Sequence, residues 1–152
     1  MRSEGMLNMY TLKIVDGDLA VRGDGNVTQL TGGDRISQEL ACWLLEPLGT
    51  DKVYGKFGST LEDMVGLPIL QDYLDDVRIE VERVVNNYVA YQRGQIKALC
   101  SGNTQDALNS WNDDDVIAAV DSIEVEAVAD TVKVTVTLTT ASGRGVTVSQ
   151  IV

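Results

Sequence analysis

The chain has 152 residues, of which 44% are hydrophobic and 23% charged, and this length and composition predict one folded domain with a core of its own. The same apolar content excludes an intrinsically disordered chain. Twelve basic against 23 acidic residues give a formal net charge of −11, which repels phosphate backbones and argues against nucleic-acid binding.

The N-terminal segment predicts a flexible tail followed by a hairpin. Residues 1–9 lack the charged and apolar blocks of a signal peptide, and no apolar run of the chain reaches the ~20 residues of a membrane helix. We therefore expect a protein made and kept in a reducing cytoplasm, away from membranes. Leu12 and Ile14, then Leu19 and Val21, alternate on either side of a turn at residues 16–18, which predicts two short strands.

A short amphipathic helix is predicted next. Its apolar residues lie three and four apart at Ile36, Leu40, Trp43 and Leu44. Asp34 is the expected N-cap, and Pro47 with Gly49 is expected to end the helix.

The loop after this helix interleaves glycines with Tyr54 and Phe57, a pattern typical of a bent loop that is anchored by aromatic rings. Gly58 is expected to need a positive φ or a close approach of the backbone. A second short helix is predicted over residues 60–65.

The longest helical pattern runs over residues 70–99. Its apolar stripe consists of Leu70, Leu74, Val77, Val81, Val84, Val85 and Tyr88. This stripe predicts a core helix rather than a coiled coil, because the heptads are few and the flanking charges mostly acidic. Gly94 is expected to kink or end it.

Residues 101–120 predict a loop, one or two helical turns over 104–111, and a short helix over 116–120. Asp113, Asp114 and Asp115 are interpreted as a solvated cap of that last helix, because consecutive side chains diverge and rarely converge on a metal ion. Cys42 and Cys100 are interpreted as buried thiols, since two cysteines without a histidine cannot complete a zinc site in one chain. We expect no metal and no cofactor.

The C-terminal region has the clearest strand pattern. Valines and a leucine alternate with threonines and a lysine over residues 131–139, flanked by strands around 123–127 and 146–149. These predict a three-stranded meander with its apolar face against the long helix and at least one open edge. The predicted fold class is α+β: hairpin, short helix, glycine–aromatic loop, long helix and three-stranded antiparallel sheet.

This order of elements resembles the baseplate wedge proteins of contractile phage tails, the sheath-initiator family related to type VI secretion baseplate components. The motif positions that carry the resemblance are Gln38, Gly49, Phe57, Gly58, Leu61, Asn87 and Tyr88, together with Leu44-Leu45 at the end of the first helix. The resemblance covers roughly residues 16–152.

The chain departs from the family pattern in two places. Many members carry Glu-Pro-Arg after the Asn-Tyr pair, where this chain has Val89-Ala90-Tyr91. That change leaves open how the protein docks on wedge subunits. Residues 93–119 are longer than in compact members and are interpreted as an insertion that provides an extra contact surface.

The resemblance implies a structural protein of the virion tail baseplate that connects the wedge to the sheath. It implies that the protein templates the first sheath ring by strand addition, because an unpaired edge offers main-chain bonds to an incoming strand. The residues expected to serve this addition are Val132, Val134, Val136, Leu138, Val146 and Val148. The implied partners are the sheath protein, wedge subunits, and tube or hub proteins, with six copies around the tail and no enzymatic activity.

Two alternatives remain open at the level of sequence. Relatives have been labelled lysozyme-like, and a peptidoglycan-cleaving enzyme needs two carboxylates, for which Glu46, or Glu62 near Asp63, are candidates. The other alternative is a small cytoplasmic adaptor unrelated to tails.

Overall fold

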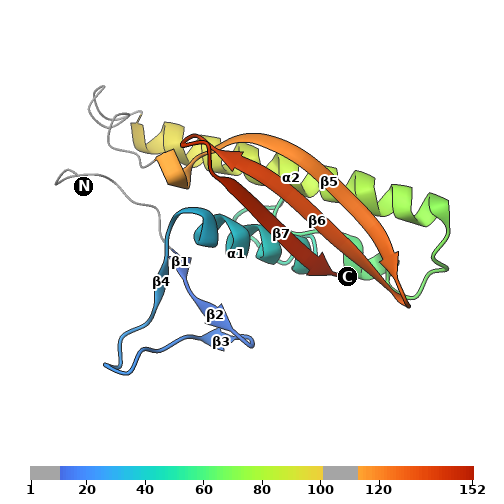
Figure 1. The fold of residues 1–152 in the computed structure, drawn as a ribbon, viewed down its shortest axis with the longest axis horizontal. Coiled ribbons are helices and arrows are strands. Elements are labelled where there is room, and N and C mark those ends of the chain that lie inside the picture. The colour runs from blue at the N-terminus through green and yellow to red at the C-terminus, as the bar shows by residue number, and fades with distance from the viewer. Residues whose placement is uncertain (1–10, 101–112) are drawn as a thin grey trace.

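The structure, a computed structural model, describes residues 11–100 and 113–152, with side chains described for 11–97 and 114–152. It has two layers, in which the C-terminal sheet lies across two helices (Figure 1). The elements are β1 (Thr11–Leu12), β2 (Ile14–Val15), β3 (Asp18–Leu19), β4 (Gln29–Leu30), α1 (Gly32–Leu45), the 3₁₀ helix η1 (Leu61–Met64), α2 (Gln71–Cys100), the 3₁₀ turn η2 (Asp113–Asp115), β5 (Ile117–Val128), β6 (Thr131–Thr140) and β7 (Gly145–Ile151). The α+β class and the C-terminal meander are confirmed.

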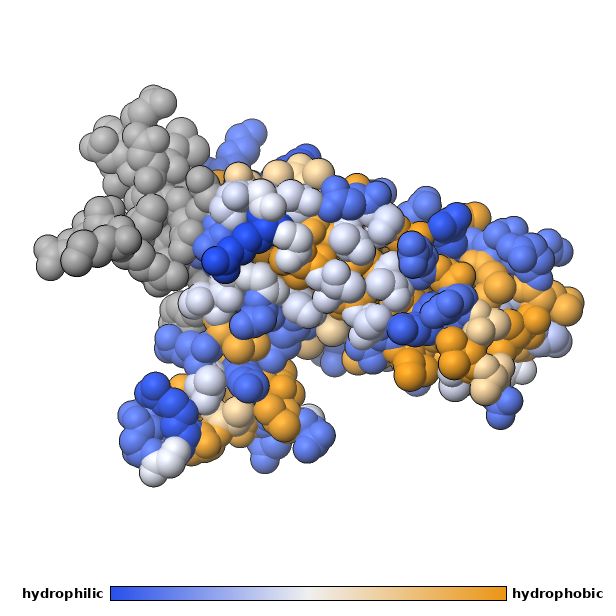
Figure 2. All heavy atoms as spheres, in the orientation of Figure 1, coloured by the Kyte–Doolittle hydropathy of each residue, from blue (hydrophilic) through white to orange (hydrophobic). Residues whose placement is uncertain are grey.

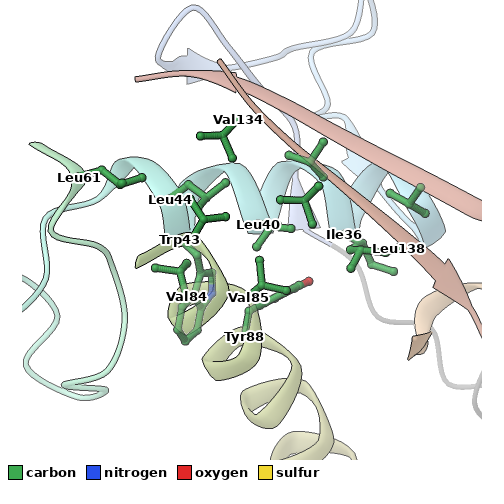
Figure 3. Close-up of a cluster of buried hydrophobic side chains, with 14 of the residues drawn as sticks. Ile36, Leu40, Trp43, Leu44, Leu61, Val84, Val85, Tyr88, Val134 and Leu138 are labelled. Atoms are coloured by element: carbon green, nitrogen blue, oxygen red, sulfur yellow. The ribbon is translucent and has the colours of Figure 1, made fainter. Parts of the chain in front are cut away.

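The sheet is antiparallel in the order β5-β6-β7, with α1 beneath β7 and α2 beneath β5. Strand β6 alternates buried valines and leucine with half-buried threonines and lysine, because side chains of a strand point to opposite faces in turn. The buried face joins the helical layer in one core (Figure 3). The buried members are Ile36, Leu40, Trp43, Leu44, Leu61, Val77, Val81, Val84, Val85, Tyr88, Ile117, Val132, Val134, Val136, Leu138, Val146 and Val148.

Helix α1 begins three residues earlier than expected, and the predicted N-cap is wrong. Thr31 is at the N-cap position without a side-chain bond, and Asp34 lies in the first turn. The Gly32 N–H instead donates to Oδ1 of Asp115 at 2.6 Å. The cap therefore comes from a residue 83 positions away. The helix ends at Leu45, just before Pro47, as predicted.

The glycine–aromatic loop is anchored as expected. Gly58 has a φ of +101°, and a Cβ built there would lie 2.7 Å from the carbonyl oxygen of Glu46. The Ser59 N–H donates to that same oxygen at 2.8 Å, and Ser59 accepts from the Leu48 N–H at 2.9 Å. Only a glycine permits this close approach of two chain segments.

Helix α2 continues through Gly94, so the predicted end there is wrong. Gly94 is exposed, and one glycine inside a long packed helix costs only about 1 kcal/mol relative to alanine. The apolar stripe is confirmed from Val77 to Tyr88, but Leu70 precedes the helix and is 66% exposed.

The helix predicted over residues 116–120 is also wrong, because β5 begins at Ile117. Its first residues pair with the end of β6, as in Ile117 with Thr140 and Val120 with Leu138. The solvated cap is wrong for Asp115, which is fully buried. In the predicted insertion, residues 93–100 belong to helix α2 and residues 117–119 belong to strand β5. The helical turns predicted over 104–111, the tail 1–9 and the side chain of Cys100 lie outside the described residues.

The predicted hairpin forms from β2 and β3, while β1 pairs with β4. Together residues 11–30 make an arm that projects from the two layers (Figure 1). Gln38 of α1 holds the arm, since its Oε1 accepts from the Ile14 N–H at 2.9 Å and its Nε2 donates to the Leu12 carbonyl at 2.7 Å.

Candidate functional site

The outer edge of β7 is unpaired among the described residues. Main-chain bonds join Thr140 to Arg144 at one end of the β6–β7 pair and Val132 to Val152 at the other. Bonded and non-bonded residue pairs alternate in an antiparallel pair. The register therefore turns the N–H and C=O groups of alternate β7 residues away from β6. These residues are Gly145, Thr147, Ser149 and Ile151.

Strand β7 itself lacks two features that usually protect an exposed edge, charge and proline, but the exposed Arg144 directly precedes its first residue and pairs with Asp114 at 3.9 Å. Residues 145–152 contain no charged side chain and no proline, and the β6–β7 register is regular over its whole length. Val146 and Val148 are buried, while Thr147 and Ser149 are exposed on the outer face. This face forms part of the pale, weakly polar surface in Figure 2. The edge is rigidly held by its own core and open to another strand.

A hollow of about 510 Å³ lies between the first half of β7 and the start of α1. Small residues line it, such as Gly32, Gly33 and Gly145, together with three charged residues, Asp34, Asp114 and Arg144. At Gly33 an added Cβ would lie 3.1 Å from Cγ2 of Val146, so α1 begins directly against β7. The hollow therefore borders the first half of the open edge.

The opposite edge, on β5, is protected. The register shifts twice, between Ile117 and Ala119 and between Val120 and Ser122. Arg78 of α2 reaches across and donates from Nη2 to the Ile123 carbonyl at 2.7 Å. Such irregularities and capped main-chain groups discourage the pairing of a further strand.

The residues expected to serve strand addition fall into two groups. Val132, Val134, Val136 and Leu138 belong to the central strand β6, whose main chain already bonds on both sides. They hold the sheet on its core and cannot pair with a partner. Val146 and Val148 belong to β7, but their own main-chain groups bond to β6. The main-chain N–H and C=O groups that point outward belong to their neighbours Thr147 and Ser149.

The family-motif positions serve the fold. Gln38 clamps the arm, and Gly58 allows the loop to approach α1. Phe57 packs edge-on against Trp43 at a centroid distance of 4.9 Å. The remaining motif positions are Leu61 and Tyr88, which are buried, Asn87, which is half-buried, and Gly49, which is exposed with a φ of +90°.

The positions that replace the family tripeptide are divided between core and surface. Val89 and Tyr91 are half-buried against the core, and Ala90 is exposed. Val89 and Ala90 also line a hollow of about 450 Å³ with the start of β5.

A buried polar network that was not predicted from the sequence joins α1, α2, η2 and β5. Arg35 donates to Oε2 of Glu39 at 2.8 Å and to the carbonyl oxygen of Asp115 at 2.7 Å. Gln92 bonds that same carbonyl and accepts from the Ile117 N–H at 2.9 Å. In the sequence, Arg35 precedes Glu39 by four residues and adjoins the apolar Ile36. This spacing is the one local pattern that indicates an ion pair near the buried face of the helix.

Tyr88 extends this network, because its hydroxyl donates to Oε2 of Glu39 at 2.7 Å. Burial, followed by the negative charge of Glu39, raises the pKa of Tyr88 well above its usual value. The phenol therefore stays a neutral donor and fixes α2 to α1.

Glu80 anchors the loop to α2. It accepts from the Thr60 N–H at 2.8 Å and from Arg83 at 2.6 Å. Burial works against its charge, but the bonds from Arg83 and Thr60 outweigh burial and lower the pKa of Glu80.

The carboxylates of the enzymatic alternative, Glu46, Glu62 and Asp63, are all exposed. Glu46 is the C-cap of α1, whereas the other two belong to η1. Within the described ranges, no group of three or more histidine, cysteine, aspartate or glutamate side chains is arranged to hold a metal ion. No helix of the described part is long and apolar enough to cross a bilayer.

Comparison with protein-family models gives no match, and no curated protein is significantly similar to the chain.

Proposed function

We propose that the protein is a structural component of a contractile-tail baseplate that templates the first sheath ring by accepting a strand of the sheath protein at β7. Two lines of argument support this proposal: the ordered motif positions that resemble sheath initiators, and the open edge of the sheet. The observation that carries it is the unpaired, uncharged and regular edge of β7, beside a protected β5.

An added strand would bond to the outward groups of Gly145, Thr147, Ser149 and Ile151. Over the seven residues of β7 such a strand spans about 23 Å at ~3.3 Å per residue. Main-chain bonds provide affinity, and the alternation of side chains fixes the register, since a slip by one residue exchanges the two faces. The protein would act without catalysis, in six copies in the virion baseplate, after synthesis in the host cytoplasm. It would contact wedge subunits, and tube or hub proteins, through other surfaces.

Proline at an outward N–H tests the proposal. Thr147→Pro removes one donor toward the partner while leaving every β6–β7 bond in place, because edge strands tolerate proline on their open side. Thr147→Ala is the matched control, since it shortens the side chain but keeps the N–H. Deletion from Gly145 onward is a poorer test, because it also removes Val146 and Val148 from the core.

Particles assembled with each variant would be imaged by electron microscopy. Thr147→Pro is expected to give baseplates with bare tubes, and Thr147→Ala sheathed tails. Full-length sheaths on Thr147→Pro particles that contain the folded variant would contradict the proposal.

A further inference from the structure

A cavity of about 270 Å³ lies on another surface, where the arm meets α1, the glycine–aromatic loop and α2. Its walls combine four aromatic rings with two carboxylates. The residues that matter here are Trp43, Tyr54, Phe57, Tyr91, Glu39 and Asp51.

The rings form one cluster around Trp43. Its ring centroid lies 4.9 Å from that of Phe57, 5.5 Å from Tyr91 and 5.7 Å from Tyr54. Tyr54 and Tyr91 are also in contact, at 4.9 Å. Trp43 is buried, whereas the other three rings are half-buried, and all four line the cavity. Aromatic faces carry a negative quadrupole, so a ring face presented to the cavity attracts a cation.

Both carboxylates are fixed by donors from the fold. Oδ1 of Asp51 accepts the main-chain N–H groups of Val53 and Tyr54, at 2.7 and 2.9 Å. Glu39 accepts from Arg35 and Tyr88. Arg35 offsets one of the two negative charges, which leaves the wall with a net negative charge.

The pKa of the Tyr91 phenol is consistent with this negative charge. Burial, then the charges of Glu39 and Asp51, raise the pKa of Tyr91. A negative, aromatic cavity of this size suits a compact positive group.

We propose that this cavity binds a guanidinium or alkylammonium group, presented by an arginine or lysine side chain of a partner protein. A polypeptide source is favoured because the exposed apolar arm borders the opening. Ile14 lines the cavity, and it is exposed together with Leu12 and Val15 at 39–48%. Figure 2 shows hydrophobic side chains on the projecting arm. The site lies apart from β7 and does not depend on the proposed strand addition.

The test is a residue-resolved NMR titration of the full chain. The probes are N-acetyl-arginine amide, its neutral counterpart N-acetyl-norleucine amide, and a short extended peptide with one arginine between apolar residues. We expect the two arginine probes to give saturable shifts at Trp43, Tyr54 and Tyr91, with the peptide binding more tightly. The norleucine probe is expected to give no saturable shift.

Asp51→Asn keeps an acceptor for the two N–H groups but removes the charge, and is expected to weaken arginine binding about fivefold. Asp63→Asn, the same change at an exposed position outside the cavity, is the matched control and should leave binding unchanged. Tyr54→Leu, which keeps apolar volume but removes a ring, gives a second measure and is also expected to weaken binding.

Equal binding of the arginine and norleucine amides, or an affinity unchanged in both Asp51→Asn and Tyr54→Leu, would overturn the cation site. Equal affinity of the peptide and the arginine amide would overturn its assignment to a partner protein.

Discussion

Substitution of Gly58 separates the two reasons for a glycine in the aromatic loop. Its φ of +101° strains any other residue, and a Cβ would lie 2.7–2.9 Å from main-chain atoms of Glu46 and Pro47. Those atoms belong to the backbone at the end of α1, so they cannot move aside as a flexible side chain would. The loop itself must shift, together with the bonds that Ser59 makes to Glu46 and Leu48.

The magnitude follows from these two terms. Backbone strain at a positive φ costs about 1–3 kcal/mol, and each weakened main-chain bond about 0.5–1.5 kcal/mol. With both Ser59 bonds weakened, Gly58→Ala is therefore expected to lower the free energy of unfolding by about 2–6 kcal/mol.

Two other glycines of the same loop are matched controls. Gly49 has a φ of +90° but nothing within 4 Å of an added Cβ, so Gly49→Ala is expected to cost only the strain, about 1–2 kcal/mol. Gly55 has neither feature, and Gly55→Ala should change stability by less than about 0.5 kcal/mol. Urea unfolding followed by circular dichroism measures all three. A Gly58→Ala protein as stable as Gly49→Ala would refute the argument from close approach.

Two further substitutions test the buried charges. Arg35→Met leaves Glu39 and Asp115 without their guanidinium and is expected to lower the free energy of unfolding in urea by about 3–5 kcal/mol. Arg93→Met, at an exposed position, is the control and should change it by less than about 0.5 kcal/mol. Equal losses in the two variants would contradict the buried network. The pKa of Glu80 is lowered in the folded state, so its stabilisation is present above its unfolded value of 4.5 and is lost as the pH falls through the lower folded value. Glu80→Gln should therefore be less stable than the native protein at neutral pH and should lose less stability below pH 4.5. Glu82→Gln, at an exposed position of the same helix, is the control and should keep the acid dependence of the native protein. A native-like acid dependence of stability in Glu80→Gln would contradict the lowered pKa of Glu80.

Regular patterns with a local cause could be predicted from the sequence. The alternation of valine and threonine over residues 131–139 fixes both the strand and its buried face, and the stripe from Val77 to Tyr88 fixes the inner side of α2. The positive φ of Gly58 could also be predicted locally, because a glycine directly after an anchored aromatic residue indicates an unusual backbone conformation.

Two of the errors concern residues whose structure depends on partners far away in the sequence. Residues 116–120 fit a short helix as well as a strand, and pairing of Ile117 with Thr140 decides the outcome. Likewise Asp34 is a reasonable N-cap by sequence, but the side chain that caps α1 is Asp115, which lies 83 positions beyond Gly32 in the chain. The open edge required the order of strands in space, which places β6 in the middle and leaves β7 outside.

Amide hydrogen exchange in β7 tests the central claim most directly. In the free protein, the N–H groups of Thr147, Ser149 and Ile151 point outward and should exchange quickly, while those of Val146, Val148 and Gln150 bond to β6 and should exchange slowly. If β7 accepts a strand of the sheath protein, addition of purified sheath protein should slow exchange at the three outward positions and leave the inward ones slow. Outward amides that still exchange quickly when the sheath protein is bound would contradict strand addition at this edge.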